Sequence, residues 1–101
     1  FHGFTAAPFQ WRAAADSLFQ AGYNILAPRL PGHAQAGTWW QGSPPPLPTQ
    51  VEDYERFALA WLQQAQAISD RVIVAGLGAG ATLAAWLALE QVQAIDRAIV
   101  I

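Results

Sequence analysis

The chain has 101 residues, of which 53% are hydrophobic and 12% charged, and its formal net charge is −2. This balance is typical of a globular segment with a sizeable core and excludes a disordered chain. The few basic residues form no patch, so we expect no nucleic-acid partner. The chain contains no cysteine, which excludes disulfide frameworks, thiolate metal sites and a cysteine nucleophile and favours a cytoplasmic location.

Membrane insertion and metal binding are also not expected. No apolar run approaches the roughly 20 residues that a membrane-spanning helix needs. His2 and His33 stand alone, without further side chains at metal-ligand spacing, so we predict neither a metal nor a cofactor.

The first half of the chain predicts one helix and short extended segments. Residues 1–5 are typical of the end of a strand that enters a loop, and Pro8 suits the first turn of a helix that runs to about residue 21, where Gly22 ends it. Residues 24–27 predict a short buried strand. Residues 28–48 hold most of the prolines and form an irregular stretch too long for an ordinary connector, so we expect a functional or covering loop.

The second half predicts alternating helices and strands. Thr49 and Glu52 match a capping box at the start of a helix over residues 49–68. Strands are expected at 71–75 and 97–101, with a helix at 79–90 between them. Helices alternating with nearly continuous apolar strands predict the α/β class, with a parallel sheet covered on both faces, and residues 1–101 are expected to belong to one domain.

The most informative motif is the glycine-rich turn at residues 76–80, Gly-Leu-Gly-Ala-Gly, between the predicted strand and helix. In the G-x-S-x-G elbow of serine hydrolases, a strained turn of this kind lifts the serine hydroxyl above the sheet. Here the central residue is Gly78. The pattern therefore predicts a nucleophile elbow that lacks its nucleophile.

Four segments together resemble the α/β-hydrolases, and most of all their carboxylesterases and monoacylglycerol lipases. They are His-Gly-Phe-Thr at residues 2–5, Ala-Gly-Tyr-Asn-Ile-Leu-Ala-Pro at 21–28, Leu-Pro-Gly-His at 30–33 and the turn at 76–80. The resemblance implies an α/β-hydrolase fold, an ester or acyl substrate and chemistry through a serine acyl-enzyme. It also implies that the backbone N–H groups of Phe4 and Ala79 form the oxyanion hole, where two donors meet the charge of the transition state.

The resemblance also bears on what accompanies this segment. The acid and the histidine of the triad are expected on the carboxyl side of the last strand. The strand ending at Phe1 is expected between those at 24–27 and 71–75. We therefore expect the sequence to cover only the amino-terminal half of the domain.

Several other residues are candidates for a substrate-binding or catalytic site. Phe4, Trp39 and Trp40 are predicted to contact the substrate, the tryptophans as an aromatic flap or, alternatively, as a cap on the following helix. His2 and His33 are interpreted as structural. Four aspartates on helix faces or turns are interpreted as solvated surface residues: Asp16, Asp53, Asp70 and Asp96. Three serines are not interpreted as substitute nucleophiles, because no elbow surrounds them: Ser17, Ser43 and Ser69.

Two other functions remain open at this point. Gly76, Gly78 and Ala81 satisfy the dinucleotide fingerprint G-x-G-x-x-G/A, whose backbone N–H groups hold a pyrophosphate. Against it, the carboxylate expected at the end of the following strand is missing, because Asp96 precedes that strand. A binding protein without catalysis on the hydrolase fold is the other alternative, and it follows directly from Gly78.

Overall fold

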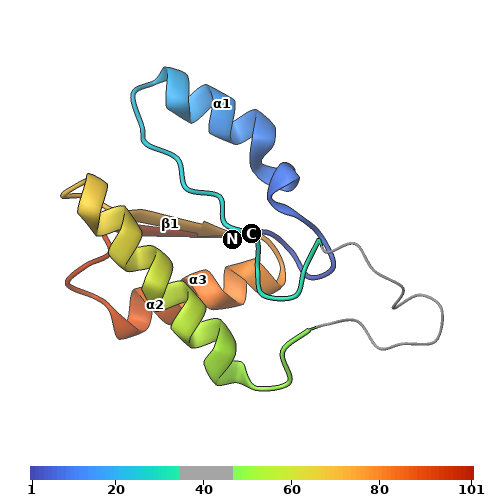
Figure 1. Cartoon of the computed structure of the whole chain (residues 1–101). Helices are drawn as coiled ribbons and strands as arrows, with labels where there is room; N and C mark the ends of the chain where they lie inside the picture. The colour runs from blue at the N-terminus through green and yellow to red at the C-terminus, as the bar shows by residue number, and fades with distance from the viewer. Residues whose placement is uncertain (35–46) are drawn as a thin grey trace.

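The computed structural model describes residues 1–34 and 47–101. Along the chain it contains one 3₁₀ turn, three α-helices and two strands, which Figure 1 labels where there is room. They are η1 (Pro8–Trp11), α1 (Arg12–Gln20), α2 (Val51–Ile68), β1 (Ile73–Gly76), α3 (Ala79–Glu90) and β2 (Arg97–Val100).

The two strands form a parallel pair joined by a helical crossover. β1 and β2 are in register from Ile73 opposite Arg97 to Gly76 opposite Val100. Parallel neighbours need a long connection, which α3 supplies here. Phe1 lies along the other edge of β1, because its N–H group donates to Ala75 O at 2.5 Å and its carbonyl accepts from Leu77 N–H at 3.1 Å. Residue 1 thus takes the place beside β1 that the sequence predicted.

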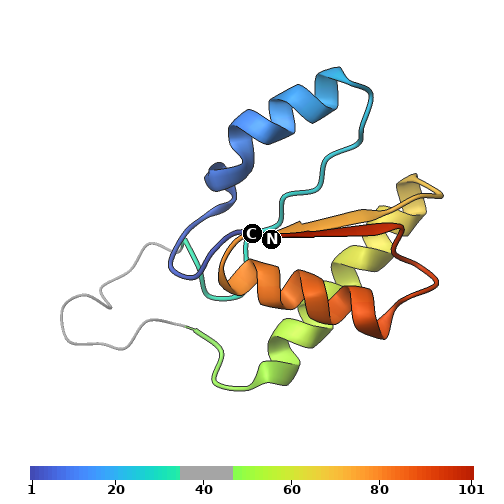
Figure 2. The ribbon, with the colours of Figure 1, turned by 180° about the vertical axis from the view of Figure 1, so that it is seen from behind.

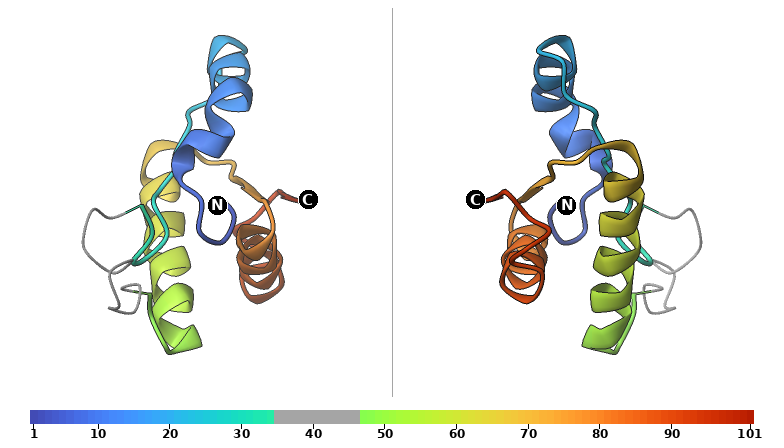
Figure 3. Two further views of the ribbon diagram at one scale, coloured as in Figure 1. Left: turned by 90° about the vertical axis from the view of Figure 1, so that its right-hand side faces the viewer. Right: turned by 90° about the vertical axis from the view of Figure 1, so that its left-hand side faces the viewer.

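The helices lie on both sides of this small sheet. α3 packs directly against β1 and β2, and α2 packs against α3. Figures 1 and 2 show α2 and α3 below the strands and α1 above them. The end-on views of Figure 3 show the same separation of α1 from the other two helices. The predicted α/β class is confirmed.

The core lies between the sheet, α2 and α3. Its buried members are aliphatic side chains: Leu30, Ala58, Leu62, Val74, Leu83, Ala84 and Leu87. Burying one leucine side chain stabilises the fold by about 1.5–3 kcal/mol. α3 contributes the largest share, which suits a helix whose sequence is apolar on almost every side.

The strand predicted at residues 24–27 does not form. These residues have no regular secondary structure, and all but Ile25 are exposed. A strand is defined by the neighbour to which it bonds. Among the described residues no segment pairs with 24–27, since Phe1 bonds to β1 instead. Residues 25–27 are apolar, as a buried strand requires, but a strand forms only where a neighbouring strand pairs with it, and the sequence does not specify that neighbour.

The capping box at Thr49 is also wrong. α2 begins after Gln50, which has extended backbone angles, and no side chain caps the first turn. Glu52 and Asp53 in that turn still favour the positive end of the helix dipole. The helix predicted from Pro8 begins as the 3₁₀ turn η1 and continues as α1. The predicted strands at 71–75 and 97–101 and the helix at 49–68 are confirmed with shifts of one or two residues at their ends, and α3 has the predicted bounds.

Candidate functional site

Three segments converge where β1 ends. They are the first turn of α3, the amino-terminal residues 1–5 and residues 28–34 (Figures 1 and 2). Contacts between them confirm the arrangement: a Cβ added at Gly80 would lie 2.4 Å from His2 O, and Leu30 N–H donates to His2 Nε2 at 2.9 Å. The two motifs that the resemblance placed together are therefore together in space.

The corner between β1 and α3 has the backbone expected of an elbow. Gly78 adopts φ 55° and ψ −121°, a region that side-chain-bearing residues rarely occupy. The flanking glycines are needed for close approach, because a Cβ at Gly76 would lie 2.0 Å from Gly80 O and one at Gly80 would lie 2.5 Å from Phe1 O. These distances explain both outer glycines of the motif.

The middle glycine is different. A Cβ added at Gly78 would meet only Gly3 Cα, at the ordinary contact distance of 3.8 Å. Position 78 is exposed and has room for a side chain. Only its backbone angle favours glycine there, whereas at Gly76 and Gly80 the lack of space for a Cβ requires glycine.

Two backbone N–H groups at this corner have no acceptor among residues 1–34 and 47–101. One belongs to Ala79, although the N–H groups of Gly78 and Gly80 on either side donate to Ile101 O and Leu77 O. The first turn of a helix leaves such donors unpaired. The other belongs to Phe4, an exposed residue in the loop that contacts Gly78. Both residues are exposed, and neither N–H group has an acceptor within the described chain.

His2 determines the direction of the Phe4 amide. Its ring is 1% exposed; Nε2 accepts from Leu30 N–H, so the proton lies on Nδ1, which donates to Gly3 O at 2.9 Å. Gly3 O also accepts from Ala6 N–H at 3.1 Å. In a trans peptide the C=O and N–H point in opposite directions. Two donors on the Gly3 carbonyl therefore point the Phe4 N–H away from them.

The same contacts exclude His2 as a free base. Both ring nitrogens are engaged with the backbone, and burial lowers the pKa of His2 below its usual value, with a smaller contribution from the neighbouring His33. A neutral ring in one tautomer fits an orienting role.

His33 is the second buried histidine, with 3% of its surface exposed. Its Nδ1 donates to Pro31 O at 3.0 Å. Within the described part of the chain Nε2 has no hydrogen-bond partner. An unsatisfied buried polar atom costs about 1–3 kcal/mol. The ring meets His2 and Phe4 edge to face, at centroid distances of 5.2 and 5.5 Å.

Several residues that hold the loop were not found from the sequence. Gln10 Oε1 accepts from Gly3 N–H at 2.7 Å, and Trp11 Nε1 donates to Phe1 O at 3.0 Å. Thr5 has a φ of 59°, which is strained for a β-branched residue. The polar Gln10 among apolar neighbours was a usable signal for the first contact, but the strain at Thr5 has no sequence signature.

Asp96 and Asp53 are not part of this site. Asp96 pairs with Arg71 at 2.6 Å, and Asp53 pairs with Arg56 one turn along α2. Trp39 and Trp40 lie outside the described residues. In residues 1–34 and 47–101, no three potential metal ligands of the His, Cys, Asp and Glu types gather.

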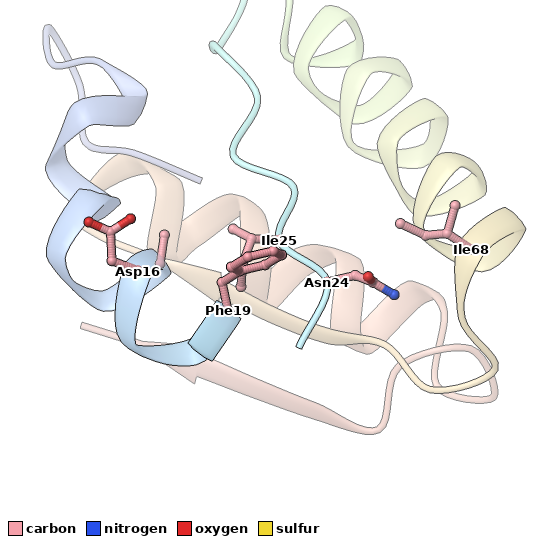
Figure 4. A pocket seen from close by; sticks show the side chains of 6 residues that line it. Asp16, Phe19, Asn24, Ile25 and Ile68 are labelled. Carbon is pink, nitrogen blue, oxygen red and sulfur yellow. The ribbon is translucent and has the colours of Figure 1, made fainter. Parts of the chain in front are cut away.

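An open apolar groove of about 350 Å³ lies elsewhere, between α1, residues 24–25 and the end of α2. Figure 4 shows Phe19 and Ile25 at its centre, with Asp16, Asn24 and Ile68 around them. None of the residues at the β1–α3 corner lines it, so we assign the groove no part in the chemistry of the elbow.

Comparison with known proteins agrees with this geometry. A sequence profile of the alpha/beta hydrolase family matches residues 1–101. The chain belongs to this family. The thermostable monoacylglycerol lipase of Bacillus sp. (strain H-257) is 32% identical over 98 residues, covering 86% of this chain and 32% of the lipase. The chain thus spans about one third of the length of this curated relative. No solved structure matches it.

A further observation concerns membranes. Among the helices that the structure describes, none is long and apolar enough to cross a bilayer.

Proposed function

We propose that this protein is of the carboxylic ester hydrolase type, and that residues 1–101 supply its oxyanion-binding half. The observation that carries the proposal is the corner at Gly78. It combines the elbow backbone angle with two glycines that allow close approach and with the Phe4 loop at contact distance. In this proposal Phe4 and Ala79 donate their backbone N–H groups to the substrate oxygen, and position 78 is the place of the nucleophile.

The proposed chemistry follows from those two donors. Attack on an ester carbonyl places negative charge on its oxygen, and fixed N–H groups stabilise that charge without reorganising. Removing one such donor typically costs about 10²–10³ in rate. Because both N–H groups belong to exposed residues and lack acceptors within the described chain, they meet this requirement.

Glycine at position 78 carries no hydroxyl, so the sequence as it stands forms no acyl-enzyme. His2 is held by the backbone at both ring nitrogens, and His33 is buried. We therefore propose that the general base and its acid come from outside residues 1–101. A non-catalytic protein that binds acyl compounds on the same fold remains the second candidate, favoured by Gly78 itself.

The proposed substrate is a small-molecule ester or acyl compound. The similar Bacillus protein is named as a monoacylglycerol lipase, which favours esters with one aliphatic chain. Phe4 supports an apolar substrate, because this residue is 56% exposed beside the two amides that lack an acceptor within the described chain. Contacts from Trp39 and Trp40, and the cytoplasmic location, remain predictions.

The test restores the hydroxyl. We expect Gly78→Ser in the full-length protein to raise kcat/KM for p-nitrophenyl butyrate by at least about 10³, the size of effect attributed to activated nucleophiles with their bases. Gly78→Ala is the matched control, since it imposes the same backbone strain of about 1–3 kcal/mol without the hydroxyl. Equal activity in the Ser and Ala variants would refute the hydrolase proposal and favour the binding protein.

The dinucleotide alternative is less well supported. Asp96, which lies 20 residues after Gly76, precedes β2 and pairs with Arg71 instead of standing free at a strand end. A fluorescence titration with NADH tests it separately: saturable binding that Gly78→Ser abolishes would favour the nucleotide site over the ester site.

A further inference from the structure

We propose that His33 is a positioning residue for the Phe4 amide, acting through its ring and not through its hydrogen bond. This inference rests on the proposed function, in which the Phe4 N–H is one of the two oxyanion donors. It assigns a role to a residue whose sequence context suggested only a structural turn.

Three aromatic rings pack together at the oxyanion loop. His33 lies between His2 and Phe4 and meets both nearly edge to face, with interplanar angles of 67° and 78°. Edge-to-face pairs are specifically attractive, since the positive rim of one ring meets the negative face of the other. One ring from the 30–33 turn therefore contacts the two residues that flank Gly3.

His2 and Phe4 together restrain the Gly3–Phe4 peptide group. The His2 ring holds the Gly3 carbonyl through Nδ1, and the Gly3–Phe4 peptide carries the N–H of the proposed site. Rotating that peptide requires the His2 ring or the Phe4 ring to move. Since His33 packs against both, it restrains the peptide from its two ends.

The hydrogen bonding of His33 and its ring contacts involve different parts of the chain. Nδ1 of His33 bonds only within its own turn, to Pro31 O, and Nε2 has no partner among the described residues. Within the described chain, neither nitrogen forms a hydrogen bond with residues 2–5. Contact with the oxyanion loop is made by the faces and edges of the ring.

Two substitutions divide these contributions. His33→Asn keeps a donor near the Nδ1 position for Pro31 O but removes the ring. His33→Phe keeps an aromatic ring of similar shape but removes both nitrogens. If the ring positions Phe4, the Phe variant behaves like the parent and the Asn variant does not.

The first measurement does not depend on catalysis. In ¹H–¹⁵N spectra of the full-length protein, we expect the Phe4 amide signal to move or broaden in His33→Asn and to stay near its parent position in His33→Phe. Similar perturbation in both variants, or a larger one in His33→Phe, would overturn the proposal.

The second measurement uses the Gly78→Ser background with p-nitrophenyl butyrate. We expect His33→Asn to lower kcat about tenfold while KM changes less than about twofold, because a misplaced donor weakens transition-state stabilisation more than substrate binding. We expect kcat of the His33→Phe variant to stay within about threefold of the parent value. A loss confined to KM, or equal losses in the two variants, would contradict a positioning role.

The two arms distinguish this inference from the function on which it rests. If Gly78→Ser is inactive, the hydrolase proposal fails, while the amide spectra still decide whether the His33 ring positions Phe4. If Gly78→Ser is active and the spectra of the two variants are alike, the inference about His33 fails alone.

Discussion

The β1–α3 corner and the α1 region, residues 8–27, differ in how closely their residues contact the rest of the described chain. At the corner, backbone approaches backbone so closely that a Cβ at Gly76 or Gly80 would lie within 2.5 Å of other atoms. α1 contains no buried residue at all. The conformation of the corner is fixed by contacts between described residues. In α1, no described residue covers the apolar face. The two regions therefore differ in how closely their backbone and side chains contact other described residues, not in how many apolar residues they contain.

The largest expected effect tests this difference in burial. Leu87 in α3 is 2% exposed and Phe19 in α1 is 68% exposed. We expect Leu87→Ala to lower the free energy of unfolding by about 3–4 kcal/mol, because it leaves a cavity in the core. Phe19→Ala is expected to change it by less than about 0.5 kcal/mol.

Chemical denaturation of the full-length protein measures both, with the exposed Leu89→Ala as a control on the same helix as Leu87. A loss for Phe19→Ala comparable with that for Leu87→Ala would show that α1 is covered in the full-length protein and would end the contrast between the two regions.

The next effect compares two glycines. Gly80→Ala forces a methyl group against Phe1 O and His2 O, so we expect a loss of about 2–3 kcal/mol. At Gly22, which follows α1, φ is 100° but nothing lies within 4 Å of an added Cβ. Gly22→Ala then meets only the unfavourable backbone angle, a cost of about 1 kcal/mol. Thermal unfolding midpoints check the order, and equal losses would show that close approach contributes nothing at the corner.

The smallest expected effect concerns pH. Burial lowers the pKa of His2 in the folded state, so the unfolded chain binds more protons once the pH falls below about 6.5. The contribution of His2 to stability is therefore fully present above that pH and is lost as the pH falls toward the lowered pKa.

His2→Gln tests this at the corner, since its side-chain oxygen can still accept from Leu30 N–H but does not titrate. Unfolding measured from pH 7.5 to 5.0 is expected to show a shallower decline for His2→Gln than for the parent. A parent curve with the same slope as the variant would mean that His2 is protonated equally in both states.

Much of the site was predictable because it is written in short motifs. The turn at residues 76–80 identified the corner, since only glycine tolerates the approach seen at Gly76 and Gly80. The role of His33 was not predictable, because ring contacts between residues 2, 4 and 33 require knowing how two distant segments meet. Gln10 stands out in the sequence only as a polar residue among apolar neighbours, and its bond to Gly3 N–H depends on how the loop meets the helical turn.

The sequence by itself determined the α/β class, the position and length of α3 and the glycine at the centre of the corner, because periodicity and backbone freedom are local properties. Only the tertiary structure decided that residues 24–27 form no strand, that α2 starts without a side-chain cap and that two buried histidines hold the Phe4 loop. Strand pairing, capping geometry and the orientation of a peptide group all depend on which partner is nearby, and that depends on the packing of the chain as a whole.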